Sequence, residues 1–428
     1  MKRRVLSLCL AVSALLLSSQ PLSAKTENKM PKAAIVFVHG LGGWGEGTFL
    51  DAVWPHWGMG AGSIKNYLES LGYEAHAASV GPISSAWDRA CELYAHITGT
   101  RTDYGAAHSK AHGHARYGTD YSQALVPDWG ADKKLHLIGH SFGGATVRLF
   151  VQLCAAGDAA EKKATKAADL SPLFKGGLSK YIISVTTLAA PHNGAKSGSR
   201  DMDAVAQTGG GDKSSGLNLS GMFGQMVSIG AYFPLATRIY PFRLEQFGLA
   251  PGAAWTNGFS SVAKAGTAFM ASGDTAYTDL SVDGAAALNK RIRLQKGIYY
   301  FSWASQTTKA DKDGNQVPTS AVSAIFQAGS AMTGRKSAAY RTKGGILIDD
   351  SWLANDGMVS VVSARYPFTE AHTDYNPKNI KKGIWNCMPL LDKYDHADFC
   401  GGPMRLFGAK DIKPFFAEIA EMLSKLPA

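Results

Sequence analysis

The sequence predicts an α/β fold with a mostly parallel central sheet, and three features carry this prediction. Residues 33–38 form an uninterrupted apolar run, as expected for a strand that is buried on both faces. Residues 135–138 form a second largely apolar run that leads into a glycine-rich turn. A helix-like segment, residues 145–150, follows that turn. Strands that pass through a short turn into a helix are typical of α/β proteins.

The turn after the second run reads Gly-His-Ser-Phe-Gly at residues 139–143. Small residues two before and two after a serine let the backbone turn sharply enough to hold the hydroxyl clear of the sheet. By itself this pattern also occurs in ordinary glycine-rich loops, but here a strand precedes it and a helix follows it. The context therefore predicts a nucleophile elbow of an α/β-hydrolase, with Ser141 as the nucleophile.

The loop after the first run, residues 39–45, is also rich in glycine. In acyl transfer, two backbone N–H groups stabilise the negative charge that develops on the carbonyl oxygen. One comes from the residue after the nucleophile, here Phe142, and the other from this early loop, for which Leu41 is the best candidate. The alternative is a loose surface loop, which the position directly after a strand disfavours.

A serine nucleophile needs a base and an acid, which follow it in the order Ser, Asp, His in this fold. Three histidines follow Ser141. His192 comes before any suitably placed acid, and His372 lies in a polar stretch that is predicted to be an exposed loop. His396, shortly before the last helix, is therefore the predicted base. Asp356 is the predicted acid, although an Asp-Gly pair by itself more often marks a plain turn.

The first residues predict a secretory signal peptide spanning residues 1–24. Three basic residues precede an apolar run, residues 5–17, and Ala24 offers a small residue for cleavage. The run is shorter than the ~20 residues that are needed to span a bilayer. The mature chain, residues 25–428, is then expected to be one domain with large insertions, secreted to the periplasm or outside the cell.

The charge of the chain bears on its partners. Loss of Lys2, Arg3 and Arg4 would lower the formal net charge from +10 to +7, which still favours anionic surfaces such as lipid headgroups. The basic residues form no stripe interleaved with aromatic residues, so nucleic-acid binding is not predicted. No feature of the sequence indicates an obligate protein partner.

Histidines and carboxylates cluster between the first strand and the elbow, at Asp88, His108, His112 and His114. Imidazole and carboxylate ligands suit a tetrahedral zinc ion. From the spacing alone, however, these residues fit a solvated polar face equally well.

Six segments give the sequence a resemblance to a known family: residues 80–92, 103–118, 170–174, 184–187, 352–357 and 381–386. In these segments it resembles the zinc-containing thermoalkalophilic lipases of bacilli and the related staphylococcal lipases. The resemblance implies the triad Ser141, Asp356 and His396, in agreement with the order argument. It also implies the zinc ligands Asp88, His108, His114 and Asp274. Four protein ligands leave no open position, so the zinc is expected to be structural.

The resemblance also implies how the insertions are used. The zinc would link insertions at about residues 80–120 and 250–280. A lid at about residues 200–249 would cover the site and open at a lipid–water interface.

The loop after His396 departs from the family. The family's calcium site has two acidic ligands there; Asp398 matches the first, but the second is lost at residues 401–403, which makes calcium doubtful. Cys387 and Cys400 lie in this loop-rich region, and we predict that they form a disulfide, which an exported protein can keep. Cys91 and Cys154 are expected to be buried free thiols.

Together these features predict a secreted serine hydrolase of carboxylic esters that acts through an acyl-enzyme, with triacylglycerols as the substrate class. A short-chain carboxylesterase or a polyester hydrolase would use the same machinery, because a fold does not determine its substrate. Two rivals from other classes are a hydrolase in which the zinc performs the chemistry and a non-catalytic surface-binding module. The complete triad disfavours both.

Overall fold

The structure is a computed structural model that describes residues 33–196, 239–250, 253, 257–402 and 410–427. Its centre is a seven-stranded sheet with the order β12-β13-β7-β6-β5-β1-β2, in which all neighbouring strands run parallel. The predicted mostly parallel sheet is thereby confirmed. Its strands are β1 (Ala33–Val38), β2 (Ala75–Ala78), β5 (Lys134–His140), β6 (Ile182–Leu188), β7 (Tyr299–Trp303), β12 (His372–Asp374) and β13 (Trp385–Cys387).

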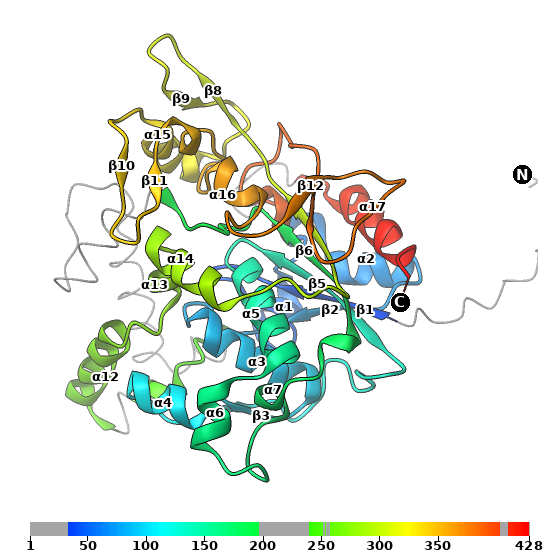
Figure 1. The fold of residues 1–428 in the computed structure, drawn as a ribbon, viewed down its shortest axis with the longest axis vertical. Coiled ribbons are helices and arrows are strands. Elements are labelled where there is room, and N and C mark those ends of the chain that lie inside the picture. The colour runs from blue at the N-terminus through cyan, green and yellow to red at the C-terminus, as the bar shows by residue number, and fades with distance from the viewer. Residues whose placement is uncertain (1–32, 197–238, 251–252, 254–256, 403–409, 428) are drawn as a thin grey trace, which may run out of the picture.

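Helices cover both faces of the sheet (Figure 1), so apolar side chains of the strands are buried on both faces. Successive side chains of a strand point to opposite faces. In β1, Val36 and Val38 accordingly belong to one buried cluster, together with side chains of α3 (Ala86–Thr98) and α5 (Gly143–Ala156). Ile35 and Phe37 belong to a second cluster, together with side chains of α2 (Ile64–Ser70) and α17 (Lys413–Ser424).

Smaller elements surround this core. Three two-stranded sheets pair β3 (Arg101–Asp103) with β4 (Tyr117–Asp120), β8 (Thr308–Ala310) with β9 (Gln316–Pro318), and β10 (Tyr340–Arg341) with β11 (Leu347–Ile348). The remaining described α-helices are α1 (Phe49–Val53), α4 (Ala106–His112), α6 (Ala159–Ala164), α7 (Pro172–Lys175), α12 (Phe259–Ala271), α13 (Ala276–Leu280), α14 (Val282–Arg291), α15 (Gln327–Gly334) and α16 (Val361–Arg365). In Figure 1, α4 and α12 lie near each other at one end of the molecule, far from β8 and β9.

Short 3-10 helices complete the described structure: η1 (Met59–Ala61), η2 (Ser179–Tyr181), η3 (Glu245–Phe247), η4 (Ala324–Phe326), η5 (Asp350–Trp352) and η6 (Asp398–Cys400). The predicted signal peptide and most of the predicted lid, residues 200–238, lie outside the described residues. Within the described part of the chain, no helix has the length and apolar character that a membrane span requires.

Candidate active site and metal clusters

Ser141 lies on a sharp turn between β5, which ends at His140, and α5, which begins at Gly143. Its φ of +54° is in the left-handed region, which non-glycine residues rarely adopt. The glycines allow this turn, because a Cβ on Gly139 would lie 2.5 Å from the Gly143 carbonyl oxygen. A Cβ on Gly143 would collide with the Val38 carbonyl oxygen of β1. The local geometry is thus that of a nucleophile elbow.

The three predicted triad residues lie in one chain of hydrogen bonds. His396 Nε2 lies 2.8 Å from Ser141 Oγ, and His396 Nδ1 lies 3.0 Å from Asp356 Oδ2. A carboxylate only accepts, so the proton of the neutral imidazole belongs on Nδ1, and Nε2 accepts the serine hydroxyl. The other Asp356 oxygen accepts the amides of Met358 and Val359, at 3.0 and 2.8 Å. These bonds hold the carboxylate in place.

The two rejected histidines have other partners. His192 is buried, with Nε2 3.1 Å from Thr187 Oγ1. The exposed His372 stacks on Tyr366 at a ring distance of 3.5 Å. Within the described residues, neither His192 nor His372 forms a hydrogen bond with Ser141.

The predicted oxyanion loop lies directly against the nucleophile. A Cβ on Gly40 would lie 2.7 Å from Ser141 Cβ, so only glycine fits between the loop and the elbow. Leu41 follows in the turn after β1, and Phe142 is the N-cap of α5. Neither amide is paired with an acceptor in the part of the chain that the structure describes. Both amides are therefore available to a ligand at Ser141.

Arg89, which the sequence analysis did not single out, supports this loop from behind. The side chain is fully buried. Its guanidinium donates to the His39 carbonyl oxygen, to the Gly81 carbonyl oxygen at 2.6 Å and to Thr146 Oγ1 at 2.8 Å. Burial lowers its pKa to about 10, which leaves it charged at neutral pH. Arg89 thus links the oxyanion loop to α5.

The four predicted zinc ligands also converge. One ligand atom of each, Asp88, His108, His114 and Asp274, lies within 4.8 Å of the others. His108 Nε2 is 3.3 Å from Asp88 Oδ1 and 3.0 Å from Asp274 Oδ2, and His114 Nε2 is 3.1 Å from the same Asp274 oxygen. These side chains come from α3, from α4 and the segment after it, and from the segment after α12.

The donor atoms of this cluster are not fully satisfied by one another. Asp88 Oδ1 and His114 Nε2 are buried and have no hydrogen-bond partner among the described residues. His114 Nδ1 donates to the Ala115 carbonyl oxygen at 2.8 Å, which leaves the lone pair on Nε2. Burial opposes a charge on His108, but the nearby carboxylates of Asp274 and Asp88 raise its pKa to about 9. The two imidazoles and two carboxylates are thus a donor set that fits a cation, and the tautomer of His114 leaves its Nε2 lone pair for one. His112 is not part of this cluster: its Nδ1 donates to the Ser272 carbonyl oxygen at 2.9 Å.

Comparison with known proteins identifies the family. A model of the family described as "Lipase-like, C-terminal domain" matches residues 31–427. This chain belongs to that family. It is 32% identical to a lipase of Staphylococcus epidermidis over 398 residues, 90% of this chain and 54% of that one. It is 33% identical to lipase 1 of Staphylococcus aureus over 376 residues, 86% of this chain and 50% of that one. The chain thus spans about half the length of these lipases.

Solved structures of similar proteins agree with the lipase-like family. The Staphylococcus hyicus lipase matches with a TM-score of 0.76 and 30% identity over 94% of this chain and 97% of that one. Lipase 1 of Pelosinus fermentans matches with a TM-score of 0.73 and 35% identity over 93% of this chain and 100% of that one. EstA of Clostridium botulinum matches with a TM-score of 0.77 and 32% identity over 93% of this chain and 88% of that one. The resemblance to staphylococcal lipases and the α/β-hydrolase fold are thereby confirmed.

The disulfide prediction is wrong for this lipase-like chain. Cys387 and Cys400 are both buried free thiols, as are Cys91 and Cys154, for which this was expected. Cys387 lies on β13, where its thiol is 3.7 Å from the Arg365 carbonyl oxygen. Cys400 lies in η6 and faces two histidines instead. Their short separation in sequence was misleading because a strand of the sheet fixes one of them.

The loop that matches the family's calcium site has an internal cation beside it. Lys410 Nζ lies 3.6 Å from Asp398 Oδ2 and 3.4 Å from the centre of the Tyr394 ring. The same Asp398 oxygen accepts the Asp395 amide at 2.9 Å. A lysine ammonium thus stands next to the carboxylate that the resemblance assigns to calcium.

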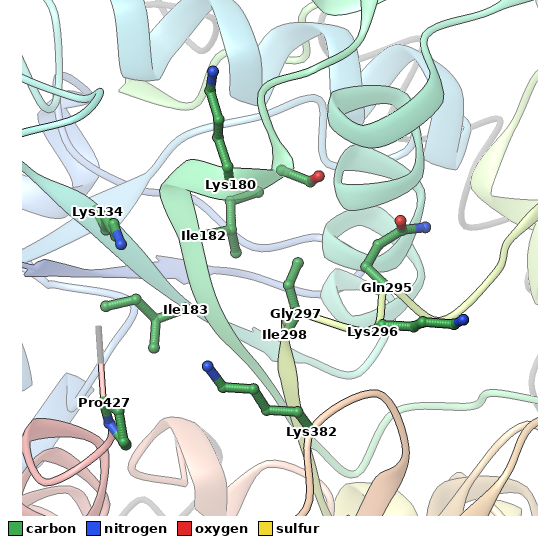
Figure 2. A pocket seen from close by; sticks show the side chains of 11 residues that line it. Lys134, Lys180, Ile182, Ile183, Gln295, Lys296, Gly297, Ile298, Lys382 and Pro427 are labelled. Carbon is green, nitrogen blue, oxygen red and sulfur yellow. The ribbon is translucent and has the colours of Figure 1, made fainter.

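A separate hollow lies at the opposite edge of the sheet (Figure 2). Its volume is about 330 Å³, and it is lined at the amino ends of β5, β6 and β7, whereas Ser141 follows the carboxyl end of β5. In Figure 2 the ammonium groups of Lys180 and Lys296 point away from each other. This hollow therefore does not belong to the serine site.

Proposed function

We propose that this chain is an exported serine hydrolase of carboxylic esters. The supporting observation is the hydrogen-bonded series Asp356, His396 and Ser141, in which Ser141 lies on a turn with a strained φ. Beside it are the amides of Leu41 and Phe142, which have no acceptor among the described residues. An isolated serine hydroxyl is a poor nucleophile, and such a series makes it reactive.

In the proposed mechanism, Ser141 Oγ attacks the carbonyl carbon of the ester while His396 Nε2 takes the hydroxyl proton. The amides of Leu41 and Phe142 hold the negative charge that forms on the carbonyl oxygen. His396 then gives the proton to the leaving alkoxide, and an acyl-enzyme remains. A water molecule, deprotonated by the same nitrogen, attacks the acyl carbon; the bond to Ser141 Oγ breaks, His396 returns the proton to Oγ, and the acid is released. Asp356 accepts from Nδ1 throughout and stabilises the imidazolium.

The proposed substrates are triacylglycerols, which the name of the staphylococcal relatives, lipase, supports. A short-chain carboxylesterase or polyester hydrolase is the second candidate, because the same groups act on any ester that reaches Ser141. The predicted lid and the action at a lipid–water interface remain proposals. Hydrolysis of p-nitrophenyl esters of graded chain length, with and without emulsified triglyceride, separates the candidates. Preference for long chains and the emulsion supports a lipase, and preference for short soluble esters supports the esterase.

We also propose that Asp88, His108, His114 and Asp274 hold a structural zinc ion. When bound, the ion supplies four coordinate bonds that tie the segment after α12 to α3 and α4. Ser141→Ala tests whether the serine performs the chemistry while the zinc ion is only structural. The variant should lose hydrolysis and labelling by a fluorophosphonate, with its zinc content unchanged. Activity that survives in this variant would instead favour a zinc-dependent hydrolase.

The remaining proposals concern organisation. We propose that residues 1–24 are a signal peptide and that residues 25–428 form one domain, with zinc-linked insertions and a lid. We also propose that the Lys410 ammonium neutralises Asp398, so that activity needs no added calcium. A calcium-selective chelator should then leave both activity and the midpoint of thermal unfolding unchanged, and a drop in either would contradict this.

A further inference from the structure

A second cluster of metal-ligand side chains lies behind the serine site. His56, His140 and Cys400 are all buried, and one donor atom of each lies within 4.8 Å of the other two. Cys400 Sγ is 3.5 Å from His56 Nε2 and 3.3 Å from His140 Nδ1. The three side chains come from distant parts of the sequence, namely the turn after α1, the end of β5 and η6.

The spacing of the donor atoms fits a tetrahedral ion. With Zn–S and Zn–N bonds of about 2.3 and 2.0–2.1 Å, sulfur and nitrogen ligands of one zinc ion lie about 3.6 Å apart. The two observed sulfur–nitrogen distances are close to that value. One thiol and two imidazoles suit a zinc-like, thiophilic ion and do not suit calcium, which takes oxygen ligands.

The protonation state of His140 also fits coordination. Its Nε2 lies 2.8 Å from the carbonyl oxygen of His396, which can only accept a hydrogen bond. The proton of the neutral ring is therefore on Nε2, and the lone pair on Nδ1 faces Cys400. Metal-binding histidines typically donate their second ring N–H to a carbonyl or carboxylate in this way.

His56 is held in place by its surroundings. Its ring packs against the rings of Trp44, Trp57 and His39 at centroid distances of 4.8, 5.7 and 5.7 Å. Its backbone amide donates to Asp51 Oδ1 at 3.3 Å. Binding an ion would therefore require little rearrangement of this ligand.

We propose that His56, His140 and Cys400 form a second metal site for a thiophilic ion such as Zn²⁺. Bound there, the ion fastens Cys400 of η6, four residues after His396, to His140 at the strand end directly before Ser141. The bound ion would thus hold His396 and Ser141, the two reacting side chains, in a fixed relative position; we call this the locking role of the site. It is independent of the cluster around Asp274 and of the ester that is hydrolysed.

Cobalt(II) is the probe that separates the two sites, because only a site with a thiolate gives a sulfur-to-cobalt charge-transfer band in the near ultraviolet. The purified protein is stripped with a chelator and titrated with Co²⁺ without oxygen, and bound metal is counted by elemental analysis. We expect two cobalt ions per chain and a charge-transfer band. Cys400→Ser should lose one ion and the whole band, whereas Asp274→Ala should lose one ion and keep the band.

Two further variants keep the test decisive. His56→Gln removes a ligand without touching the thiol and should also lose the band, which covers the case in which Cys400→Ser does not fold. Cys387→Ser is the matched control, since among the described residues no histidine is bonded to this buried thiol, and it should behave as the unchanged protein. A band that is absent from the unchanged protein, or one that persists in Cys400→Ser or His56→Gln, would overturn the site.

The locking role has its own readout. In Asp274→Ala, which retains only the second site, added Zn²⁺ should raise the midpoint of thermal unfolding, because an ion that binds only the folded state stabilises it. Introducing Cys400→Ser into that variant should remove the rise. An unchanged midpoint in Asp274→Ala would overturn the lock.

Discussion

Replacing Arg89 by methionine tests how the oxyanion loop is held. Methionine fills much of the same volume but donates no hydrogen bond, so the buried carbonyl oxygens of His39 and Gly81 and the hydroxyl of Thr146 each lose a donor. Hydrogen bonds to a charged group contribute about 1.5–3 kcal/mol each. Removal of the buried charge offsets part of that loss, because charged groups are costly to bury. We expect the free energy of unfolding to fall by about 3 kcal/mol.

The same substitution should slow the reaction. His39 lies two residues before Leu41, whose amide is proposed to hold the oxyanion. Loss of one well-placed oxyanion donor costs about 3 kcal/mol in the barrier, which is a factor of ~10² in kcat. We therefore expect Arg89→Met to lower kcat for a soluble p-nitrophenyl ester by up to ~10², with KM little changed. The measurements are urea unfolding and steady-state kinetics well below the unfolding transition.

Arg148→Met is the matched control. Arg148 is also buried, but it pairs with Glu370 at 3.2 Å and does not contact the oxyanion loop. It should lose stability and keep kcat. The reasoning would be refuted if folded Arg89→Met had the kcat of the unchanged protein, or if both arginine variants lost kcat equally.

Three further predictions concern the triad, the metal cluster and pH. Asp356→Asn should keep the fold but lower kcat by ~10⁴, because an amide favours the wrong imidazole tautomer; a loss below tenfold by steady-state kinetics would contradict its role. Stripping the metal should lower the thermal unfolding midpoint of the unchanged protein more than that of Asp274→Ala, measured by calorimetry; equal shifts would argue against a structural ion there. Burial lowers the pKa of His136 to about 4 from 6.5, so the unfolded state binds a proton first as pH falls. The stability from this residue is complete above pH 6.5 and decreases toward pH 4, by about 2 kcal/mol at pH 5. Urea unfolding of His136→Gln should show a correspondingly weaker decrease between pH 7 and 5, and an unchanged decrease would contradict this assignment.

The sequence by itself was sufficient to predict those features that depend on a pattern within a short stretch or on the order of residues in the chain. The apolar run of β1, the strand and glycines around Ser141, and the chain order that selects Asp356 and His396 each depend on patterns that can be recognised in a short stretch. The four side chains of the proposed zinc site were predicted only because the sequence resembles a known family, and the structure brings them together. In each case the local chemistry and the tertiary fold require the same residues.

Other features were decided only by the tertiary structure. Sequence spacing suggested a bond between Cys387 and Cys400, but β13 holds one thiol in the sheet while η6 turns the other toward His56 and His140. Arg89 looked like one residue of a helix, and only the packing of α3 brings its guanidinium to the His39 carbonyl oxygen. Both features depend on contacts between residues far apart in the chain. Such contacts are set by how the strands and helices pack, which no short stretch of sequence encodes.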